Sequence, residues 1–408
     1  MAEKKKPGFF YGYIVLMAAF SIKTLAYGSN RSFGVFLVPM LAEFGWTRAG
    51  ISTAFTLGMI VMGLMSLVAG RLTDRIGPRL VLLVSGFFLG TGYLLVSQIS
   101  DIWQFYVFYG MMTGIGMSGC GAPLFSIIAR WFFRRRSLMS GILFVGPALG
   151  ITAIPLLSSL LISACGWRTS YLILGSVVLV GTMTAALFLR RDPGGMGLKP
   201  YGLDKTEAQG RDVQVQGFSP LEALRTRQFW LLAVLSFANF FLINIIVVHI
   251  VVHATGMGIS ATIAASILSV SAGVSIPGRI IAGAFADRVG NKRALLVYYI
   301  LGLVAFLLLL VARDVWMFYV VAAVFGVGFW ASFSLLSPIT AELFGLKAHG
   351  TIFACTMVAT TLGGAVGPVL AGRIFDVTGS YQPAFIICIL VTIVAIVSTI
   401  FLRPTHRL

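Results

Sequence analysis

Arg279 lies inside an apolar stretch of the sequence, at 261–285, where a charged side chain is costly unless it has a task. Ser275 and Ser271 precede it by four and eight residues, so all three share one face of a helix. A guanidinium stays charged at any working pH and grips a carboxylate through two parallel hydrogen bonds. This face therefore predicts a binding site for a small carboxylate. The alternative is an arginine that reaches the lipid headgroups or bonds the carbonyls of a helix end.

A second polar stripe lies in the first apolar run, at 9–40. Lys23, Tyr27, Asn30 and Arg31 fall at spacings that place them along one edge of a helix, which we expect to face a cavity. Arg31 is near the outer end of the run and could reach only surface water, while Lys23 could bond a backbone carbonyl. Tyr27, Asn30 and Arg31 are predicted to contribute to substrate binding.

Aromatic and amide side chains in two later runs could complete the site. Trp330 and Phe329 lie in the middle of 315–340, and Phe240 and Asn244 lie within 228–256. Together Trp330, Phe240 and Asn244 could form the apolar wall and the polar contact of a small pocket. Plain packing is the alternative for the aromatic residues, whereas a buried amide needs hydrogen-bond partners.

Few groups of the sequence could carry a proton or neutralise the cations of the apolar runs. His249 and His253 share a face and can titrate near physiological pH, although solvated residues at a mouth are the alternative. No acidic residue lies well inside an apolar run. We therefore expect Lys23, Arg31 and Arg279 to find their counter-ion in a negatively charged substrate, and Arg279 is the best candidate to bind it.

The composition indicates that these residues belong to a membrane protein. Of the 408 residues 58% are apolar and only 11% are charged, against about a quarter in soluble domains, and the mean hydropathy is +0.96. The net charge of +17 would suggest a nucleic-acid partner in a soluble protein, but in a membrane protein it reports loop orientation. The four cysteines are scattered and enzyme motifs are missing. We expect no nucleic-acid partner, no metal, no cofactor and no enzymatic activity.

Twelve apolar runs are long enough to cross a bilayer, which takes roughly 20 residues. They lie at 9–40, 48–70, 80–99, 102–129, 137–163, 168–190, 228–256, 261–285, 293–312, 315–340, 349–373 and 380–402. An even number of spans puts both termini on one side, and most of the 30 basic residues fall on that side. Because basic loops are retained inside the cell, both termini are predicted to be cytoplasmic.

The chain repeats itself after 213 residues. The positions that match without a gap are Gly70 with Gly283, Asp74 with Asp287, Arg75 with Arg288, Gly150 with Gly363, Pro155 with Pro368 and Gly166 with Gly379. We therefore expect two six-span halves, at 1–190 and 228–408, joined by a polar cytoplasmic linker at 191–227. Parallel halves of this kind describe one transporter architecture, in which the substrate is held between the halves near the midplane.

The repeated GxxxDRxG turn resembles the signature of the major facilitator superfamily, where its Asp and Arg tie helix ends together in one access state. Three segments are also similar to the monocarboxylate transporter branch of that superfamily, at 27–36, 130–141 and 166–175. The resemblance implies an all-α membrane protein of twelve transmembrane helices in two six-helix bundles. It also implies a conformational gate, formed by Gly70, Asp74, Arg75, Gly283, Asp287 and Arg288.

The same resemblance implies roles for residues already singled out. Arg279 stands where the family has a substrate-binding arginine in span eight, and Arg31 corresponds to the family's span-one lysine. Animal members have an aspartate one turn before that arginine, where this chain has Ser275, so their proton relay does not carry over. The bacterial oxalate/formate exchangers have a lysine in span eleven, and the run 349–373 holds none.

As a whole, the sequence resembles a bacterial L-lactate and proton symporter. We expect a monomeric secondary active transporter of the bacterial inner membrane, whose partners are a small organic anion, a proton and the lipid bilayer. The proton could travel on the substrate carboxyl, on His249 or His253, or on an acid at the rim. One alternative is an exchanger of dicarboxylate for monocarboxylate, with Arg31 or Lys23 as second cation. Another is a non-transporting sensor that keeps the fold.

Overall fold

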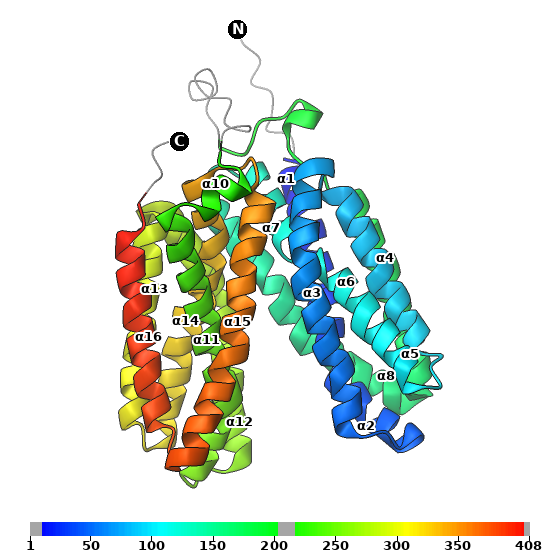
Figure 1. Ribbon diagram of the computed structural model, residues 1–408, viewed down its shortest axis with the longest axis vertical. Coiled ribbons are helices and arrows are strands. Elements are labelled where there is room, and N and C mark those ends of the chain that lie inside the picture. The colour runs from blue at the N-terminus through cyan, green and yellow to red at the C-terminus, as the bar shows by residue number, and fades with distance from the viewer. Residues whose placement is uncertain (1–9, 203–216, 404–408) are drawn as a thin grey trace. The chain divides into compact units, whose positions relative to one another are not determined.

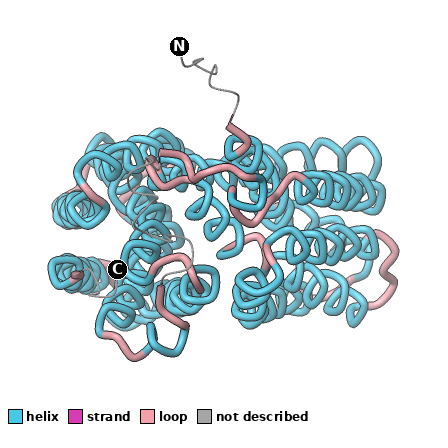
Figure 2. Tube along the Cα trace, turned by 90° about the horizontal axis from the view of Figure 1, so that it is seen from above, coloured by secondary structure: helices cyan, strands magenta, loops and turns pink. Residues whose placement is uncertain are grey.

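The computed structural model describes residues 10–202 and 217–403, and most of them are helical (Figure 1, Figure 2). The chain forms two compact units. The first unit takes in the described residues of Met1–Arg134 and Leu143–Gln214, and the second takes in those of Arg135–Ile142 and Val215–Leu408.

The linker predicted at 191–227 is described only in part, since 203–216 lie outside the described residues. The two units differ from the predicted halves at 135–142, which group with the second unit. The division into 1–190, linker and 228–408 stays a prediction.

The first unit is built from helices that form the first six spans in chain order, some spans being divided into shorter helices. They are α1 (Gly12–Arg31), α2 (Phe33–Phe44), α3 (Arg48–Ile76), α4 (Pro78–Val96), α5 (Ile102–Phe105), η1 (Tyr106–Met112), α6 (Thr113–Ser118), α7 (Ala122–Trp131), most of α8 (Arg136–Leu187) and the short η2 (Gly194–Met196). α1 and α2 together cover the predicted first span and meet at Ser32. The 52-residue α8 covers the fifth and sixth spans, because Gly166 turns the chain with φ 76° and ψ 164°.

The fourth span departs most from its prediction as one helix at 102–129. Its α5 passes into the π-helix η1, and the later break between α6 and α7 falls at residues 119–121. Glycines on both sides of Cys120 favour this break, because glycine stabilises a helix interior poorly. Such interruptions leave backbone groups outside the regular helical ladder and are frequent at functional sites.

The second unit has a regular succession of long helices. They are α10 (Pro220–Leu224), α11 (Arg227–Gly256), α12 (Ala261–Val289), α13 (Asn291–Val311), α14 (Val315–Phe344), α15 (His349–Thr378) and α16 (Gln382–Phe401), together with the first turns of α8. Because α11 to α16 alternate in direction, their ends gather at two ends of the unit. The linker-side end holds the start of α11, and the distal end holds its last turn.

Ten helices of the described chain are long and apolar enough to cross a membrane. The 52-residue α8 counts once among them although Gly166 divides it into two spans. With α1 and α2 as the first span, these helices account for the twelve runs that hydropathy predicts.

The repeat of the sequence reappears as a repeated backbone contact. A Cβ atom at Gly150 would collide with the carbonyl oxygen of Thr24, and one at Gly363 would collide with that of Phe237. Thr24 and Phe237 are themselves 213 residues apart. At both places only glycine lets two helix backbones approach so closely. The duplication therefore preserves helix packing as well as sequence.

The GxxxDRxG turns also share one backbone geometry. Gly77 ends α3 with φ 91°, and Gly290 ends α12 with φ 93°. Residues with a Cβ rarely adopt such angles, so a glycine is required after each DRx. Each glycine amide donates to the carbonyl four residues earlier, at 3.1 Å to Thr73 and 2.8 Å to Ala286.

Candidate functional site

Close packing between α12 and α14 positions Arg279 in the second unit. These two helices run in the same direction, and a Cβ atom at Gly326 of α14 would lie 2.6 Å from the carbonyl oxygen of Ser271 in α12. Small residues at the contact let the backbones approach. Trp330 follows Gly326 by one turn and Arg279 follows Ser271 by two. The guanidinium carbon of Arg279 lies 5.2 Å from the centroid of the Trp330 ring.

The polar face that includes Arg279 is buried. Arg279 is 6% exposed, Ser275 and Ser271 are each 2% exposed, and the Ser275 hydroxyl donates to the Ala272 carbonyl at 2.7 Å. Burial strengthens the attraction between a guanidinium and an anion, because little water remains to screen the charges. The indole face attracts the cation and restricts its orientation. The arrangement can therefore present a planar fork to a carboxylate.

The backbone of α12 next to Arg279 packs directly on the first turns of α8, within the second unit. A Cβ atom at Gly141 would collide with the carbonyl oxygen of Arg279, and one at Gly283 would collide with that of Ser137. Two glycines thus bring the helices into contact with no side chain between them. A side chain at either position would displace α12 and with it the guanidinium.

The aspartates of the two GxxxDRxG turns have different hydrogen-bond partners. Asp74 pairs with the guanidinium of Arg130 at 3.4 Å, which joins α3 to α7 in the first unit. Asp287 accepts hydrogen bonds of 3.0 Å each from the backbone N–H groups of Ser137 and Leu138. A carboxylate at this position stabilises the positive end of α8. Each aspartate therefore ties two helix ends together, one through a side chain and the other through backbone.

The remaining predicted gate residues divide by burial. Gly70 and Gly283 are buried, whereas Arg75 and Arg288 are exposed on the linker-side ends of α3 and α12. Gly283 allows the close contact of α12 with α8 within the second unit. The role of all six residues as a gate stays a prediction.

Lys23 is buried inside the first unit. It is 1% exposed, and its ammonium donates to the carbonyl of Cys120 at 3.3 Å. Three rings surround it, with centroids at 4.2 Å for Phe125, 5.1 Å for Tyr27 and 5.3 Å for Phe144. The bond to a backbone carbonyl, which the sequence left as one interpretation, is thus present. The break between α6 and α7 makes that carbonyl available, and the glycines around Cys120 were the signal for it.

The rest of the stripe lies in the last two turns of α1. Tyr27 and Asn30 are half-buried, and the backbone carbonyl of Asn30 accepts a hydrogen bond of 3.3 Å from the Tyr109 hydroxyl. Arg31 is exposed as the last residue of α1, as its interpretation as a surface cation requires. Substrate contacts of these residues stay a prediction.

The amide chosen from the sequence is not the most buried one of α11. Asn244 is half-buried and donates to the carbonyl of Phe240 at 3.0 Å, while the Phe240 ring packs edge-on against Phe333 at 4.6 Å. Asn239, which the sequence analysis missed, is 0% exposed and donates to the Ser332 hydroxyl at 2.5 Å. The pocket formed by Phe240, Asn244 and Trp330 stays a prediction.

The two histidines of α11 have different surroundings. His249 Nε2 lies 2.9 Å from the carbonyl oxygen of Pro368, and Nδ1 lies 3.1 Å from the Tyr381 hydroxyl. A carbonyl can only accept, so Nε2 donates and Nδ1 accepts from the tyrosine. His253, one turn later, packs against rings, including Phe385 at 5.0 Å. His249 is therefore held by two hydrogen bonds, whereas the described contacts of the His253 side chain are with aromatic rings.

Comparison with known families settles the class of the protein. The family model described as Major Facilitator Superfamily matches residues 19–353 and 283–408. The chain belongs to the Major Facilitator Superfamily. Members of this superfamily are transporters, so the predicted multi-pass membrane protein without enzymatic activity is confirmed, and its substrate is a small solute.

Within the superfamily, the chain is similar to monocarboxylate transporters along most of its length. It is 30% identical to human monocarboxylate transporter 11 over 400 residues, which cover 92% of this chain and 80% of that protein. It is 28% identical to monocarboxylate transporter 13 of the rat over 379 residues, with 92% and 85% covered.

Solved structures of two superfamily members share the fold. The transporter FucP in its outward conformation aligns with a TM-score of 0.73 at 15% identity, over 97% of this chain and all of that one. The proton:xylose symporter XylE, bound to 6-bromo-6-deoxy-D-glucose, aligns with a TM-score of 0.75 at 13% identity, over 96% of each chain. The predicted all-α transporter fold is thus confirmed.

Proposed function

We propose that the protein is a secondary active transporter that moves a small monocarboxylate such as L-lactate together with a proton by alternating access. The observation that carries the proposal is Arg279, a guanidinium buried to 6% exposure beside the Trp330 ring. An arginine is retained at this depth only for a task, and its planar fork matches a carboxylate. The similarity to monocarboxylate transporters supports the same substrate class.

Binding of the anion changes the charge of the site. With a monocarboxylate bound, Arg279 and its ligand are together neutral, which favours states in which the site is closed from water. Ser275 and the Trp330 ring contribute the polar and apolar contacts next to the guanidinium. The proton could travel on the substrate carboxyl, on His249 or His253, or on an acid at the rim.

The charged turns provide the coupling to access. Asp74 and Asp287 hold helix ends at the linker-side end of each unit, and release of these bonds would open that end. The positive-inside rule supports a cytoplasmic location of the termini, and the resemblance to bacterial symporters supports the inner membrane. We propose a monomer, since the two halves of one chain suffice for this architecture.

An exchanger of dicarboxylate for monocarboxylate is the second candidate. Lys23 favours it, because a second buried cation could bind a second carboxylate. Its contacts with the Cys120 carbonyl and three rings favour a structural task instead. We therefore rank symport first.

Uptake of labelled L-lactate into proteoliposomes tests both candidates. A pH gradient, acidic outside, should drive uptake into empty vesicles, whereas an exchanger needs anion inside. Arg279→Gln should reduce uptake at least 100-fold, and Arg373→Gln, an exposed arginine of the same unit, should retain it. Normal lactate uptake by correctly inserted Arg279→Gln protein would refute the proposed site.

A further inference from the structure

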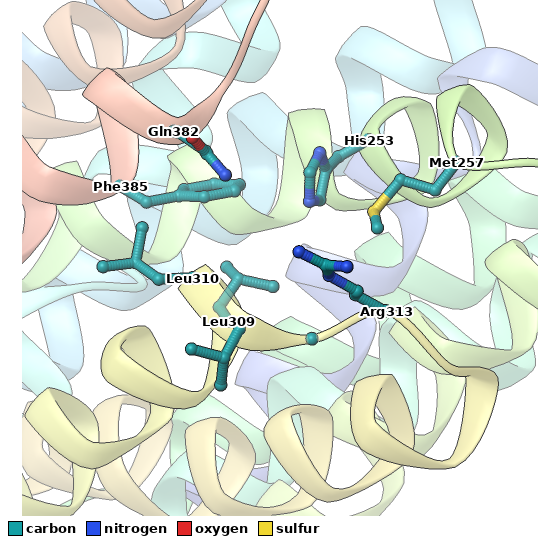
Figure 3. A pocket seen from close by; sticks show the side chains of 9 residues that line it. His253, Met257, Leu309, Leu310, Arg313, Gln382 and Phe385 are labelled. Atoms are coloured by element: carbon teal, nitrogen blue, oxygen red, sulfur yellow. The ribbon is translucent and has the colours of Figure 1, made fainter.

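A small cavity lies at the distal end of the second unit, away from Arg279 (Figure 3). Its volume is about 180 Å³, and its wall comes from the last turns of α11 and α13, the loop before α14 and the first turn of α16. All of these elements belong to the second unit, so the cavity is complete within it. The volume limits a ligand to a few carbon atoms, since drug-sized ligands occupy about 300–1,000 Å³.

Three nitrogen-bearing side chains line this cavity: Arg313, His253 and Gln382. Within the described ranges 10–202 and 217–403, none of the three side chains has a hydrogen bond or a salt bridge. Figure 3 shows the Arg313 guanidinium, the His253 ring and the Gln382 amide around one open space. His249, one turn earlier on α11, has hydrogen-bond partners at both ring nitrogens. The two histidines of this helix therefore differ in their hydrogen bonding.

The chemistry of the wall selects a small anion with an apolar end. A guanidinium binds a carboxylate with two parallel hydrogen bonds, and an imidazole or amide N–H can donate a third. The positive end of the dipole of α16, which begins at Gln382, also favours an anion. Leu309 and Phe385 provide an apolar floor that fits a methyl or short alkyl group.

We propose that this cavity is a peripheral binding site for a short-chain monocarboxylate, held by Arg313 and oriented by His253 and Gln382. The site lies at the distal end of the second unit, which the sequence predicts to face the outer solution, and a cation there raises the local concentration of anion before transport. It rests on the proposed function for its substrate class, but its anion ligand is Arg313 rather than Arg279. The two proposals can therefore fail separately.

Thiol labelling at the cavity wall tests the site directly. Met257 lines the cavity and is 41% exposed, so Met257→Cys can be modified by a soluble thiol reagent. The rate is read by mass spectrometry of the peptide that contains position 257, in phosphatidylcholine vesicles and in the Arg279→Gln background. L-lactate should slow the modification at least five-fold in a saturable manner. Lactamide, of the same size but uncharged, should leave it unchanged.

The matched variants decide what causes the protection. Arg313→Gln should abolish protection by lactate, and Arg373→Gln, an exposed arginine outside the cavity wall, should preserve it. Equal protection with and without Arg313 overturns the proposal, as does protection by phosphatidylglycerol with none by lactate. Protection in a chain that transports no lactate would keep the peripheral site and reject the proposed function. Lactate transport by the parent chain without protection at position 257 would keep the proposed function and reject the peripheral site.

A kinetic readout separates the site from a structural effect. With Arg279 intact, Arg313→Gln should raise the half-saturating lactate concentration several-fold and leave the maximal uptake rate unchanged. If the Arg313→Gln protein inserts normally but its maximal uptake rate is lost, Arg313 has a structural role and its assignment as a peripheral anion ligand is overturned.

Discussion

The two units have kept the same backbone contacts and changed the polar groups beside them. Gly150 packs on Thr24 in the first unit as Gly363 packs on Phe237 in the second. The buried cations do not follow this repeat, since the position that corresponds to Lys23 is Ser236 and the position that corresponds to Arg279 is Ser66. A duplicated fold thus stays constant where helices touch, and its chemistry comes from positions at which the copies diverged.

The two buried cations also have different environments. Lys23 donates to the Cys120 carbonyl within a group of three rings, which suits a compact ammonium. Arg279 lies over one indole ring, with two buried serines on its face of the helix. We infer that the first unit uses its cation to stabilise a broken helix and that the second unit presents its cation to substrate.

Arg279→Lys should give the largest effect, because it keeps the charge and removes the fork. Loss of one of two charge-assisted hydrogen bonds costs about 1.5–3 kcal/mol, so uptake at low lactate concentration should fall roughly 10- to 100-fold. Initial rates in proteoliposomes, normalised to inserted protein, give the measurement. If the lysine variant transports lactate like the parent, a point charge is sufficient and the contrast between the two cations disappears.

Gly150→Ala and Gly363→Ala should have large and similar effects on stability. In each variant the new methyl group meets a backbone carbonyl that cannot move without its helix, and overpacking of this kind costs about 1–3 kcal/mol. Thermal unfolding in detergent measures both. Gly63→Ala in α3 is the control, since a Cβ atom there has no neighbour within 4 Å. A clear difference between the two midpoints would show that the contact contributes differently to the stability of the two units.

Lys23→Met should destabilise the protein by about 1–2 kcal/mol, because the Cys120 carbonyl would lose its hydrogen bond in an apolar environment. The midpoint of thermal unfolding should fall by no more than a few degrees, since about 2–4 °C for each kcal/mol is typical of 150–250 residues and the shift is smaller in a longer chain. Uptake should decrease less than five-fold. Loss of uptake with an unchanged midpoint would instead make Lys23 a transport cation and favour the exchanger.

Asp287→Asn should destabilise more than Asp74→Asn. Asp287 accepts two backbone N–H bonds of 3.0 Å at a helix start, where a negative charge is worth about 0.3–1 kcal/mol. Asp74 has its described side-chain bond to Arg130 at the longer distance of 3.4 Å. Midpoints of thermal unfolding for both variants give the comparison. The reverse order would indicate that the first copy of the turn is the stronger one.

The sequence was sufficient to predict the spans, because apolar runs near 20 residues have few alternatives to a transmembrane helix. It also predicted that Arg279, Ser275 and Ser271 lie on one face, since helical spacing fixes which residues share a face. All three are buried in the structure. The repeat could be recognised from the sequence because the close helix contacts at Gly150 and Gly363 require glycine in both halves.

Other features depend on contacts that no spacing reveals. The fourth span is interrupted between α6 and α7, where Gly119 and Gly121 flank Cys120. Hydropathy does not detect this interruption, because the residues on both sides of it are apolar. Phe329 and Trp330 are neighbours in sequence, yet Phe329 is 0% exposed in the core and Trp330 lies beside Arg279. Arg313 was not singled out from the sequence, because its cavity is formed by helices distant in sequence.

Glu43→Gln should have the smallest effect, and that effect should depend on pH. Glu43 has no counterpart in the second unit, where Gly256 takes its position. Hydrogen bonds from Arg168, and then from Trp167, lower the pKa of the Glu43 carboxyl below its ordinary value of 4.5. Both partners lie at the start of the second span of α8, at 2.7 Å and 2.6 Å from the carboxylate.

A lowered pKa fixes the sign of the pH dependence. The contribution of Glu43 is fully present above pH 4.5 and is lost as the pH falls through the pKa of the folded state. The pair is half-exposed, so the contribution stays below about 1 kcal/mol. Glu43→Gln should therefore lower the unfolding midpoint slightly at pH 7, and the difference from the parent should shrink as the pH falls below 4.5. An undiminished difference at low pH would mean that the Glu43 side chain acts through packing rather than through its charge. The contrast between this charged contact of the first unit and the second unit, where Gly256 takes its place, would then not depend on charge.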